Sequence, residues 1–527
     1  MSTPKSTDEP KRFVRFLNKI AAIGNKLPDP ITLFVLLASG VVLMSAIFAG
    51  VEEQVTQRDG SVATKTVESL LSRDGIRWMF NNAIDNFTSF APLGSVLTVM
   101  LGIGVAERSG LIAVSLRIFV QSVPNSLITA ALVFAGVMSS MVADAGYVVL
   151  TPLGAVLFAG LGRHPIAGLA AAFAGVSGGF SANLFITGLD PLLSGLTQEA
   201  AQAVDPTYTV NATCNYYFMV VSTFMITIVG TWVTTKFVEP MLGTWDRSKA
   251  KGELEEPHDI TDQERRAFKG AMLVGGLCTV AIAMLAMPFS PLWDVAPEGE
   301  AALGTIQALN TFFHAVELLI AFLFLVPGIV FGVMVKRVKS DKDVAEMMSS
   351  TMATMGAYIV LAFAAAQFVA FFNHTNIGSI TAVKGAGVLQ SIGLTGVPLI
   401  LAFLFVSSMM NLFVGSASAK WAFMAPVFVP MMMYMGFSPE SVQATYRVGD
   451  SITNIISPLM PYLPIIIVFA QKYDRDAGLG TLIAAMLPYS IAFGVVWTLL
   501  LGFWFGLDIP LGPGVQTLYE VGAAATP

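Results

Sequence analysis

Long apolar runs are the feature that most limits what this chain can fold into. Residues 30–50 and 216–233 each approach the roughly 20 residues that an α-helix needs to cross a bilayer. Only 12% of the 527 residues are charged and 55% are hydrophobic, whereas soluble domains carry about 25% charged residues. A soluble fold of this composition would expose far too much apolar surface. We therefore predict an all-α polytopic membrane protein.

The distribution of charge predicts how the spans are oriented. The N-terminal tail, residues 1–26, is basic, so the positive-inside rule favours a cytoplasmic N-terminus. No small-residue cleavage site follows the first apolar run, which favours a retained span over a signal peptide. The basic loop 236–269 and the basic segment 336–342 are expected on the cytoplasmic side, and the acidic loop 289–303 on the opposite side. The polar segment 51–84 is expected to be an extracytoplasmic loop.

Polar and small residues interrupt the apolar sequence twice, in the same order. Ser139-Ser140-Met141 in the first half recurs as Ser407-Ser408-Met409 in the second. An Asn lies at a similar distance after each Ser pair, with Asn183 43 positions after Ser140 and Asn454 46 positions after Ser408. A charge at bilayer depth costs about 2.5–3.5 kcal/mol on insertion scales, so it rarely sits there without a role. Duplicated, glycine-interrupted polar segments in the two halves of a membrane protein indicate a transporter's binding site.

These interruptions divide the chain into two halves around the basic loop. We predict a first half at 27–235, the cytoplasmic loop at 236–269, a second half at 270–508 and a C-terminal tail at 509–527. Short apolar runs that flank a small-residue tip predict re-entrant hairpins at about 124–161 and 393–434, where non-helical backbone must be buried or face water. Glycine and proline breaks predict broken helices at about 165–191 and 439–467. Unwound backbone at these breaks can bind a cation or an anion.

The second broken helix carries the densest polar group. Arg447, Asp450 and Asn454 are spaced to lie on one helical face. In one interpretation Arg447 neutralises Asp450 as a structural ion pair. In the functional interpretation Arg447 binds a substrate carboxylate, which suits its planar two-pronged donors, while Asp450 and Asn454 help to hold a cation.

Other residues near the breaks leave two interpretations open. Trp421 either packs in the core or stacks on a substrate ring. Lys420 is expected to reach the interface or to pair with an acid rather than bind substrate. Asp190 and Asp144 either couple transport to protons or cap a helix. Hard oxygen ligands of the kind that Na⁺ prefers, which could equally bond to the backbone, are Ser140, Asn183, Ser416, Ser418, Thr453 and Asn411.

Several function classes are disfavoured. The chain has no Walker-type glycine-rich loop, so direct use of ATP is not expected. Ser139 and Ser418 have no histidine near them in sequence to serve as a base, which argues against a hydrolase. The four histidines and two cysteines form no metal motif. We therefore expect no enzyme activity, no cofactor beyond a bound Na⁺ or a coupled proton, and no nucleic-acid partner. A membrane receptor or sensor that binds ligand without moving it is the remaining alternative.

The motifs around these residues resemble the aminobenzoyl-glutamate transporter (AbgT) family. They are 413–422 (FVGSASAKWA), 446–451 (YRVGDS), 367–373 (QFVAFFN) and 173–179 (FAGVSGG). The resemblance covers nearly the whole chain and is close to the members linked to sulfonamide resistance. It implies a homodimer in the bacterial inner membrane, with about nine transmembrane helices and two opposed re-entrant hairpins per protomer. It also implies an inverted internal repeat and an elevator-type ion-transporter architecture.

The resemblance implies a function and a set of site residues. The implied activities are uptake of p-aminobenzoyl-glutamate and efflux of sulfonamide antimetabolites, driven by a proton or sodium gradient; import of a different dicarboxylate is the alternative substrate. The matching functional positions are Asp190, Ser418, Trp421, Arg447, Asp450 and Pro458. The matching Na⁺ positions are Asn411, Trp421, Asp450 and Asn454.

Two departures from the family pattern bear on cation binding. Other members often carry Ser-Asn-Thr where this chain has Ser139-Ser140-Met141, and the loss of the Asn and the Thr counts against a cation site in the first hairpin that matches the one in the second. Lys420 stands where some members have a neutral amide. The direction of transport and the choice between H⁺ and Na⁺ stay open on the sequence.

Overall fold

The computed structural model describes residues 28–56, 62–142, 145–250, 260–296, 305–457, 460 and 462–519. Among the positions singled out above, the tail 1–26, Asp144 and Pro458 lie outside the described residues. Within the described part, seven helices are long and apolar enough to cross a membrane, or up to nine if each of two bent helix pairs counts as one span. This agrees with a polytopic helical protein, and the predicted total of about nine depends on how the bent pairs are counted.

Helices run through nearly all of the first half. Its elements are α2 (Pro30–Ile47), β1 (Glu52–Thr56), β2 (Val62–Thr66), α3 (Arg73–Thr88), α4 (Ala91–Arg108), α5 (Leu111–Ser122), the 3₁₀ turn η1 (Asn125–Leu127), α6 (Ile128–Met138), the 3₁₀ turn η2 (Ser139–Val142), α7 (Ala145–Gly160), α8 (Pro165–Gly178), α9 (Leu189–Ala201) and α10 (Tyr216–Val233). Helix α10 continues through the π-helical turn η3 (Thr234–Val238) into α11 (Glu239–Leu242).

The second half follows the basic loop, which contains the short turn η4 (Arg247–Lys249). Its elements are α12 (Asp262–Leu285), α13 (Thr305–Ala308), α14 (Asn310–His314), α15 (Val316–Met334), α16 (Asp341–Thr354), α17 (Gly356–His374), α18 (Ile377–Ser391), α19 (Gly396–Asn411), α20 (Ala417–Tyr434), α21 (Pro439–Asn454), α22 (Leu463–Tyr473) and α23 (Leu479–Gly506).

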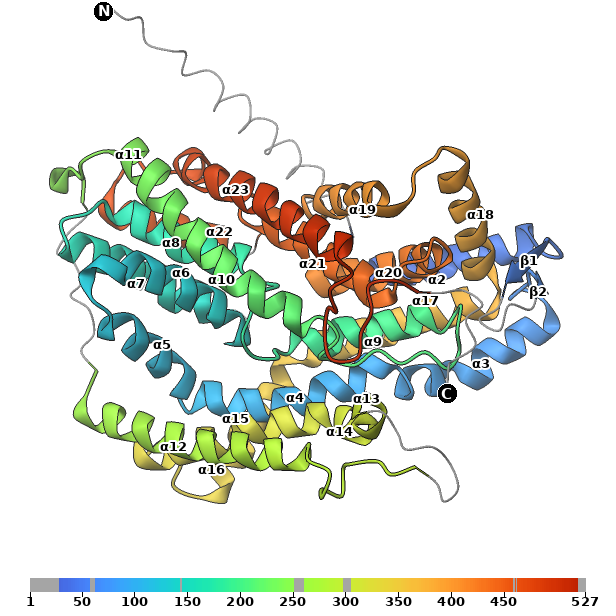
Figure 1. Ribbon diagram of the computed structural model, residues 1–527, viewed down its shortest axis with the longest axis horizontal. Helices are drawn as coiled ribbons and strands as arrows, with labels where there is room; N and C mark the ends of the chain where they lie inside the picture. Colours follow the sequence, from blue (N-terminus) through green and yellow to red (C-terminus); the bar gives the residue numbers. More distant parts are fainter. Residues whose placement is uncertain are drawn as a thin grey trace, which may run out of the picture.

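Segment 51–84, expected to be an extracytoplasmic loop, contains regular structure, and its side of the membrane stays a prediction. Strands β1 and β2 pair antiparallel, with Glu52 opposite Thr66, and α3 follows them at one end of the molecule (Figure 1). The polar alternation of the hairpin gives it one face for solvent and one for the protein. On the protein side, Lys65 Nζ donates to Ser379 Oγ at 3.0 Å and fixes the hairpin to α18.

Each predicted re-entrant range contains two short helices joined at a polar break. In the first, α6 and α7 flank the 3₁₀ turn at Ser139, and in the second, α19 and α20 flank residues 412–416. The predicted broken helices contain α8 and α9, which are separated by residues 179–188, and α21 and α22. Helices α9 and α22 run on past the predicted limits of 191 and 467, to Ala201 and Tyr473. The placement of these elements in a membrane remains a prediction.

Glycine lets α8 and α21 approach their neighbours closely. A Cβ on Gly175 of α8 would lie 2.5 Å from the carbonyl oxygen of Val133 on α6. A Cβ on Gly449 of α21 would lie 2.8 Å from Ser407 Cβ on α19. Small residues at helix contacts are how membrane helices gain packing where lipid is as apolar as the protein. The hairpin and the broken helix of each half are therefore packed backbone to backbone.

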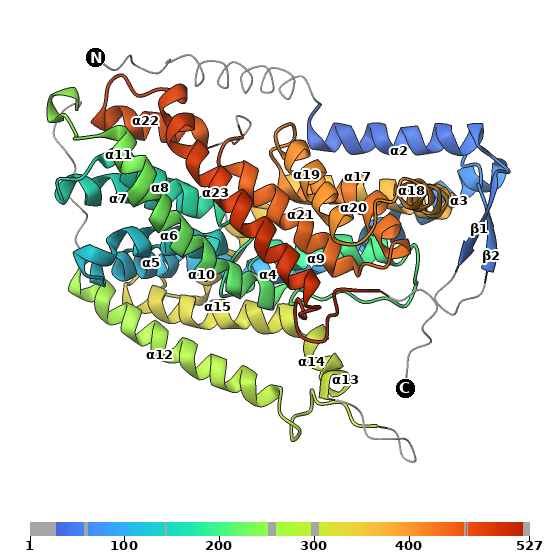
Figure 2. The ribbon, with the colours of Figure 1, turned by 45° about the horizontal axis from the view of Figure 1, so that its top comes forward.

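The buried apolar residues form two large clusters. The larger one joins the hairpins and broken helices with α2, α10, α17 and α23. A second one joins α4, α5, α12 and α15, through residues that include Ile103, Ala271 and Ile320. In Figure 2, α12 lies along the outer edge of the molecule, beside α15. Its outward residues Leu273 and Leu277 are 68% and 62% exposed, as expected of a helix that faces lipid or another subunit.

Candidate functional site

A buried ion pair joins the broken helices of the two halves. Arg447 Nη1 on α21 donates to Asp190 Oδ1 on α9 at 2.6 Å, and the two side chains are 3% and 0% exposed. Asp190 Oδ2 also accepts hydrogen bonds from the backbone N–H and the hydroxyl of Thr187, at 2.6 and 2.8 Å. Asp190 therefore fixes the turn that leads into α9 and neutralises Arg447 at once. The pair is a contact that only the folded chain brings together.

The predicted ion pair between Arg447 and Asp450 does not form. The two residues lie three positions apart on α21, but Arg447 reaches toward α9, while Asp450 faces the second hairpin. There Asp450 Oδ1 accepts a hydrogen bond from Lys420 Nζ at 2.5 Å. Each of the two charges is thus compensated by a different helix, because a buried charge requires a partner in the interface that it faces. Lys420 pairs with an acid, which is one of its two predicted outcomes, and it is fully buried rather than directed to the interface.

Three further polar groups complete the cluster around Lys420. The ammonium also donates to Asn411 Oδ1 at 2.5 Å. Asn411 Nδ2 donates to Asn454 Oδ1 at 2.9 Å and to Thr453 Oγ1 at 2.9 Å. Asn454 Nδ2 donates to Asp450 Oδ2 at 2.9 Å. Four of the predicted residues, from the end of α19 and the end of α21, therefore meet in one closed network.

This donor set does not fit a sodium ion while Lys420 is in place. Asn411, Asp450 and Asn454 come together as predicted for the Na⁺ positions, but each of their side-chain oxygens already accepts from an N–H group. Trp421 offers no side-chain oxygen. A sodium ion here would stand beside an ammonium, and two unit charges about 4 Å apart repel by about 4 kcal/mol at an effective dielectric constant of about 20.

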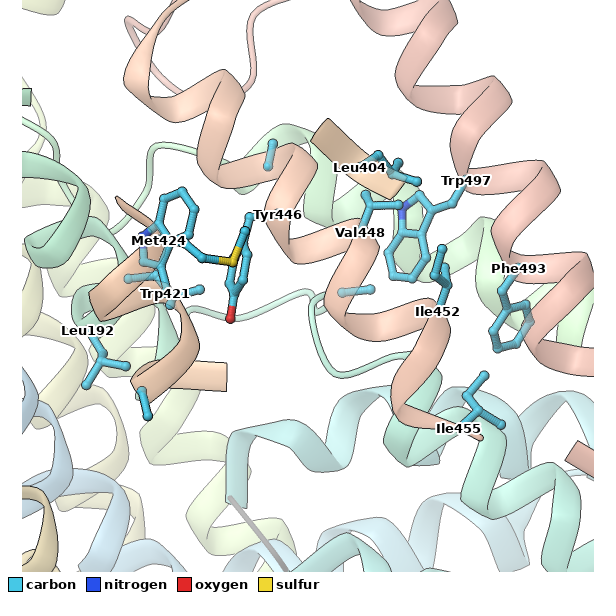
Figure 3. Close-up of a cluster of buried hydrophobic side chains, with 14 of the residues drawn as sticks. Leu192, Leu404, Trp421, Met424, Tyr446, Val448, Ile452, Ile455, Phe493 and Trp497 are labelled. Atoms are coloured by element: carbon cyan, nitrogen blue, oxygen red, sulfur yellow. The ribbon is translucent and has the colours of Figure 1, made fainter. Parts of the chain in front are cut away.

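Trp421 packs inside the protein. Its ring stacks on Tyr446 with centroids 4.4 Å apart, and its Nε1 donates to Thr197 Oγ1 on α9 at 3.0 Å. Figure 3 shows the two rings together beside Met424. The indole is fully buried. In this conformation Trp421 is a core residue, and the prediction that it stacks on a substrate ring requires the helices around it to open.

The four predicted oxygen donors outside the Lys420 cluster fall into two separate groups. Asn183 Nδ2 donates to Ser140 Oγ at 2.9 Å, so these two residues tie the first hairpin to the break after α8. Ser416 and Ser418 lie at the start of α20, where Ser416 Oγ accepts from the backbone N–H of Ala419 at 3.3 Å. None of these four makes a hydrogen bond to the Lys420 cluster or to Arg447 among the described residues. Pro458 lies outside the described residues.

A second polar group on α21 is not found by the sequence reasoning. Glu440 accepts from the Tyr208 hydroxyl at 2.9 Å. Gln443 Nε2 donates to Asn215 Oδ1 at 3.0 Å, and Gln443 Oε1 accepts from Thr197 at 2.6 Å. Both side chains are buried, at 3% and 0% exposure. The signal was available: Glu440, Gln443 and Arg447 have the same i, i+3, i+7 spacing as the group that was noticed.

A polar cavity of about 190 Å³ lies against α9. It is lined by residues of α4, α9, the segment after α9, α14 and α15, among them Ser194, Gln198, Asn211, His314 and Glu317. Pro191, the chain neighbour of Asp190, also lines it. The first turn of α9, which carries Asp190, therefore borders a space with polar walls that suits water or a polar ligand.

Comparison with known proteins identifies relatives along nearly the whole chain. The sequence model of the AbgT putative transporter family matches residues 15–519. The p-aminobenzoyl-glutamate transport protein of Escherichia coli K12 is 36% identical over 516 residues, which cover 98% of each chain.

Two solved structures also match. One is the Alcanivorax borkumensis YdaH transporter, with a TM-score of 0.84 and 42% identity over 92% of this chain and 100% of that one. The other is Neisseria gonorrhoeae MtrF, described as illuminating a class of antimetabolite efflux pumps, with a TM-score of 0.88 and 42% identity over 95% of this chain and 100% of that one. These relatives are transporters and efflux pumps rather than enzymes.

Proposed function

The chain belongs to the AbgT putative transporter family, and from this premise we propose that it is a secondary active transporter of small aromatic anions. The proposed substrates are p-aminobenzoyl-glutamate-like folate catabolites, sulfonamide antimetabolites, or both, moved at the expense of a proton or sodium gradient. Support for the substrate class comes from the names of the relatives, one a p-aminobenzoyl-glutamate transport protein and another an antimetabolite efflux pump.

The observation that carries the proposal is the Arg447–Asp190 pair. Among the described residues, the five N–H donors of the guanidinium make one hydrogen bond, from Nη1 to Asp190, and Nε has no hydrogen-bond partner. A buried donor without a partner costs about 1–3 kcal/mol. An arginine with donors to spare, paired with an aspartate in the first turn of α9, supports a carboxylate-binding role. Pro191, which follows that aspartate, lines the polar cavity. Arg447 then holds the anionic group of the substrate.

The remaining predicted residues take roles around this anion site. Trp421 faces the aryl ring once the helices around it open, and Ser418 lies at the adjoining start of α20. Asp190 and Asp450 carry proton or cation coupling. Pro458 and the glycine breaks shape the unwound backbone. Ser140 and Asn183 hold the first hairpin in the matching position. Support for these roles is the meeting of α9, α20 and α21 around Trp421 and Arg447.

The movement that carries substrate across is proposed to be of the elevator type. The distribution of buried apolar residues supports it. Most such residues of the hairpins and broken helices share one cluster, which also contains Val96 of α4 and Val120 of α5, whereas a second cluster joins other residues of α4 and α5 to α12 and α15. The first cluster is the proposed moving part and the second belongs to the proposed scaffold. Helices α4 and α5 contribute residues to both clusters, so the proposed sliding contact between the two parts lies along them.

We further propose a homodimer in the bacterial inner membrane, with the N-terminus in the cytoplasm. The apolar surface of α12 supports a contact with the bilayer or with another subunit, because only 6% of its most apolar 18-residue stretch is buried within the chain. Static light scattering of the purified protein tests the dimer. Cysteine accessibility from either side of the membrane tests the orientation.

The experiment that tests the proposed function is flux in oriented proteoliposomes. Radiolabelled p-aminobenzoyl-glutamate and a radiolabelled sulfonamide are each followed with a pH gradient and a Na⁺ gradient imposed separately. Movement driven by ΔpH makes the carboxylates the coupling groups, and movement driven only by ΔNa⁺ assigns coupling to the cation positions. Binding of either compound without movement under any gradient favours the receptor alternative. Movement of other dicarboxylates alone corrects the substrate class.

A further inference from the structure

The ammonium of Lys420 lies where the predicted sodium ligands converge. Its Nζ is 2.5 Å from Asn411 Oδ1 and 2.5 Å from Asp450 Oδ1, and the Lys420 side chain is 0% exposed. It also lies 5.3 Å above the ring of Tyr446, within reach of a cation–π contact. The lysine thus has the surroundings of a bound cation: one carboxylate, one amide oxygen and an aromatic face.

The geometry around the ammonium is complete without an added ion. Asp450 Oδ1 accepts from the ammonium, and Asp450 Oδ2 accepts from Asn454 Nδ2 at 2.9 Å. Asn411 joins the two ends of the network, since its oxygen binds the ammonium and its Nδ2 binds the side chain of Asn454 and the backbone oxygen of Asp450 at 2.7 Å. A closed set of this kind satisfies each buried polar atom, as burial requires. It also connects α19, α20 and α21.

The position of Lys420 in the chain explains why it reaches this place. Helix α19 ends at Asn411 and α20 begins at Ala417 after a five-residue break. Lys420 is in the first turn of α20, so its stem runs back toward the end of α19. The corresponding contact in the first half, Asn183 to Ser140, is between neutral groups. The second hairpin therefore carries its own positive charge.

We propose that the Lys420 ammonium is the resident cation of this site and stands in place of a sodium ion. It compensates Asp450 and holds the second hairpin against the second broken helix, the two tasks that a bound Na⁺ would perform between the same oxygens. Binding of substrate and movement of the hairpin by this chain then need no Na⁺. The consequence for transport rests on the proposed function, whereas the consequence for ion binding does not.

The test compares the response of purified protein to Na⁺ before and after Lys420 is removed. Thermal unfolding is followed in NaCl and in choline chloride at equal ionic strength, for the wild type, Lys420→Ala and Lys420→Gln. Removal of the lysine leaves Asp450 and Asn411 with free oxygens, so Na⁺ should raise the Tm of the variants, increasingly with the logarithm of its concentration once the site is saturated. The wild-type Tm should be the same in both salts.

Matched variants control for loss of charge alone. Lys384→Ala removes an exposed lysine that pairs with Glu53 at 3.4 Å, and its Tm should stay indifferent to Na⁺. Lys420→Arg keeps the charge and should also stay indifferent. The double variant Lys420→Ala with Asp450→Asn lacks the carboxylate and should lose the Na⁺ response of the single variant.

Three outcomes overturn the proposal. One is saturable stabilisation of the wild type by Na⁺ but not by choline, which would show that the ion and Lys420 coexist. Another is a pair of folded Lys420 variants without any Na⁺ response, which would make the lysine a structural tie only. If neither variant folds, direct ²²Na⁺ binding to the wild type decides, and stoichiometric binding would refute the proposal. Absence of flux in every salt would contradict the proposed function while leaving the binding result intact.

Discussion

Replacing Arg447 by alanine leaves the Asp190 carboxylate buried without its cation. The pair is 2.6 Å apart, and the two side chains are 3% and 0% exposed. Removing one partner of a buried ion pair typically costs about 3–5 kcal/mol, because the remaining charge stays desolvated. We expect Arg447→Ala to insert in the membrane, to unfold at lower temperature and to move no substrate.

A double-mutant cycle separates the charge from the packing. Asp190→Asn removes the carboxylate but keeps its shape, so Arg447→Ala combined with Asp190→Asn should be more stable than the sum of the two single losses predicts. Unfolding of the four proteins in detergent measures the coupling. Both variants that lack Arg447 should lose flux. Neutralising Asp190 in the double variant restores stability, but it does not restore the arginine that binds the anion.

Arg163→Ala is the control for loss of an arginine. Its pair with Glu239 has an N–O distance of 2.5 Å, but the side chains are 24% and 25% exposed, so the cost should be about 0–1 kcal/mol. Wild-type flux in Arg447→Ala would refute the assignment of the anion site. Additive losses in the cycle would show that Arg447 and Asp190 contribute independently.

Three further variants test other parts of the structure. Trp421→Ala removes a fully buried indole and should lower the free energy of unfolding by about 3–5 kcal/mol, measured by denaturant titration. Gly449→Ala places a Cβ 2.8 Å from a side chain of α19 and should cost about 1–3 kcal/mol, whereas Gly502→Ala, with nothing within 4 Å, should not. The backbone amides of Lys339 and Ser340 donate to the Asp343 carboxylate and lower its pKa. This contribution to stability is present above the ordinary Asp pKa and is lost as pH falls through the lower folded value. The stability of Asp343→Asn should therefore depend less on pH in the acid range, measured by thermal unfolding as a function of pH.

The membrane class and the places where the helices break could be predicted from the sequence. Apolar runs of bilayer length and the Gly, Ser and Pro residues between them determine local backbone structure, so the sequence predicts them without knowledge of the tertiary fold. Ser139 directly follows the end of α6, Ser407-Ser408-Met409 lies in the last turns of α19, and Gly178 and Asn454 end α8 and α21. The β-hairpin within segment 51–84 could not be predicted, because a short polar hairpin has too little apolar pattern to distinguish it from a loop.

The pairing of the charges could not be predicted. Arg447 and Asp190 are 257 positions apart, and Lys420 and Asp450 are 30 apart. The pairing of acidic and basic side chains depends on how α9, α20 and α21 pack. Spacing along α21 alone suggests a pair between Arg447 and Asp450, which does not form. The sequence pattern at the glycine- and proline-rich end of this segment does not single out Glu440, although its spacing to Arg447 places both residues on one face of α21.

The measurement that tests the central claim most directly is counterflow. Proteoliposomes are loaded with unlabelled p-aminobenzoyl-glutamate and diluted into a trace of labelled compound, with no ion gradient across the membrane. A carrier that exposes one site alternately to each side should concentrate the label inside for a time, above its equilibrium level, and Arg447→Ala should not. Wild-type vesicles in which the label only equilibrates, or never enters, would contradict the account of this protein as a transporter of these anions.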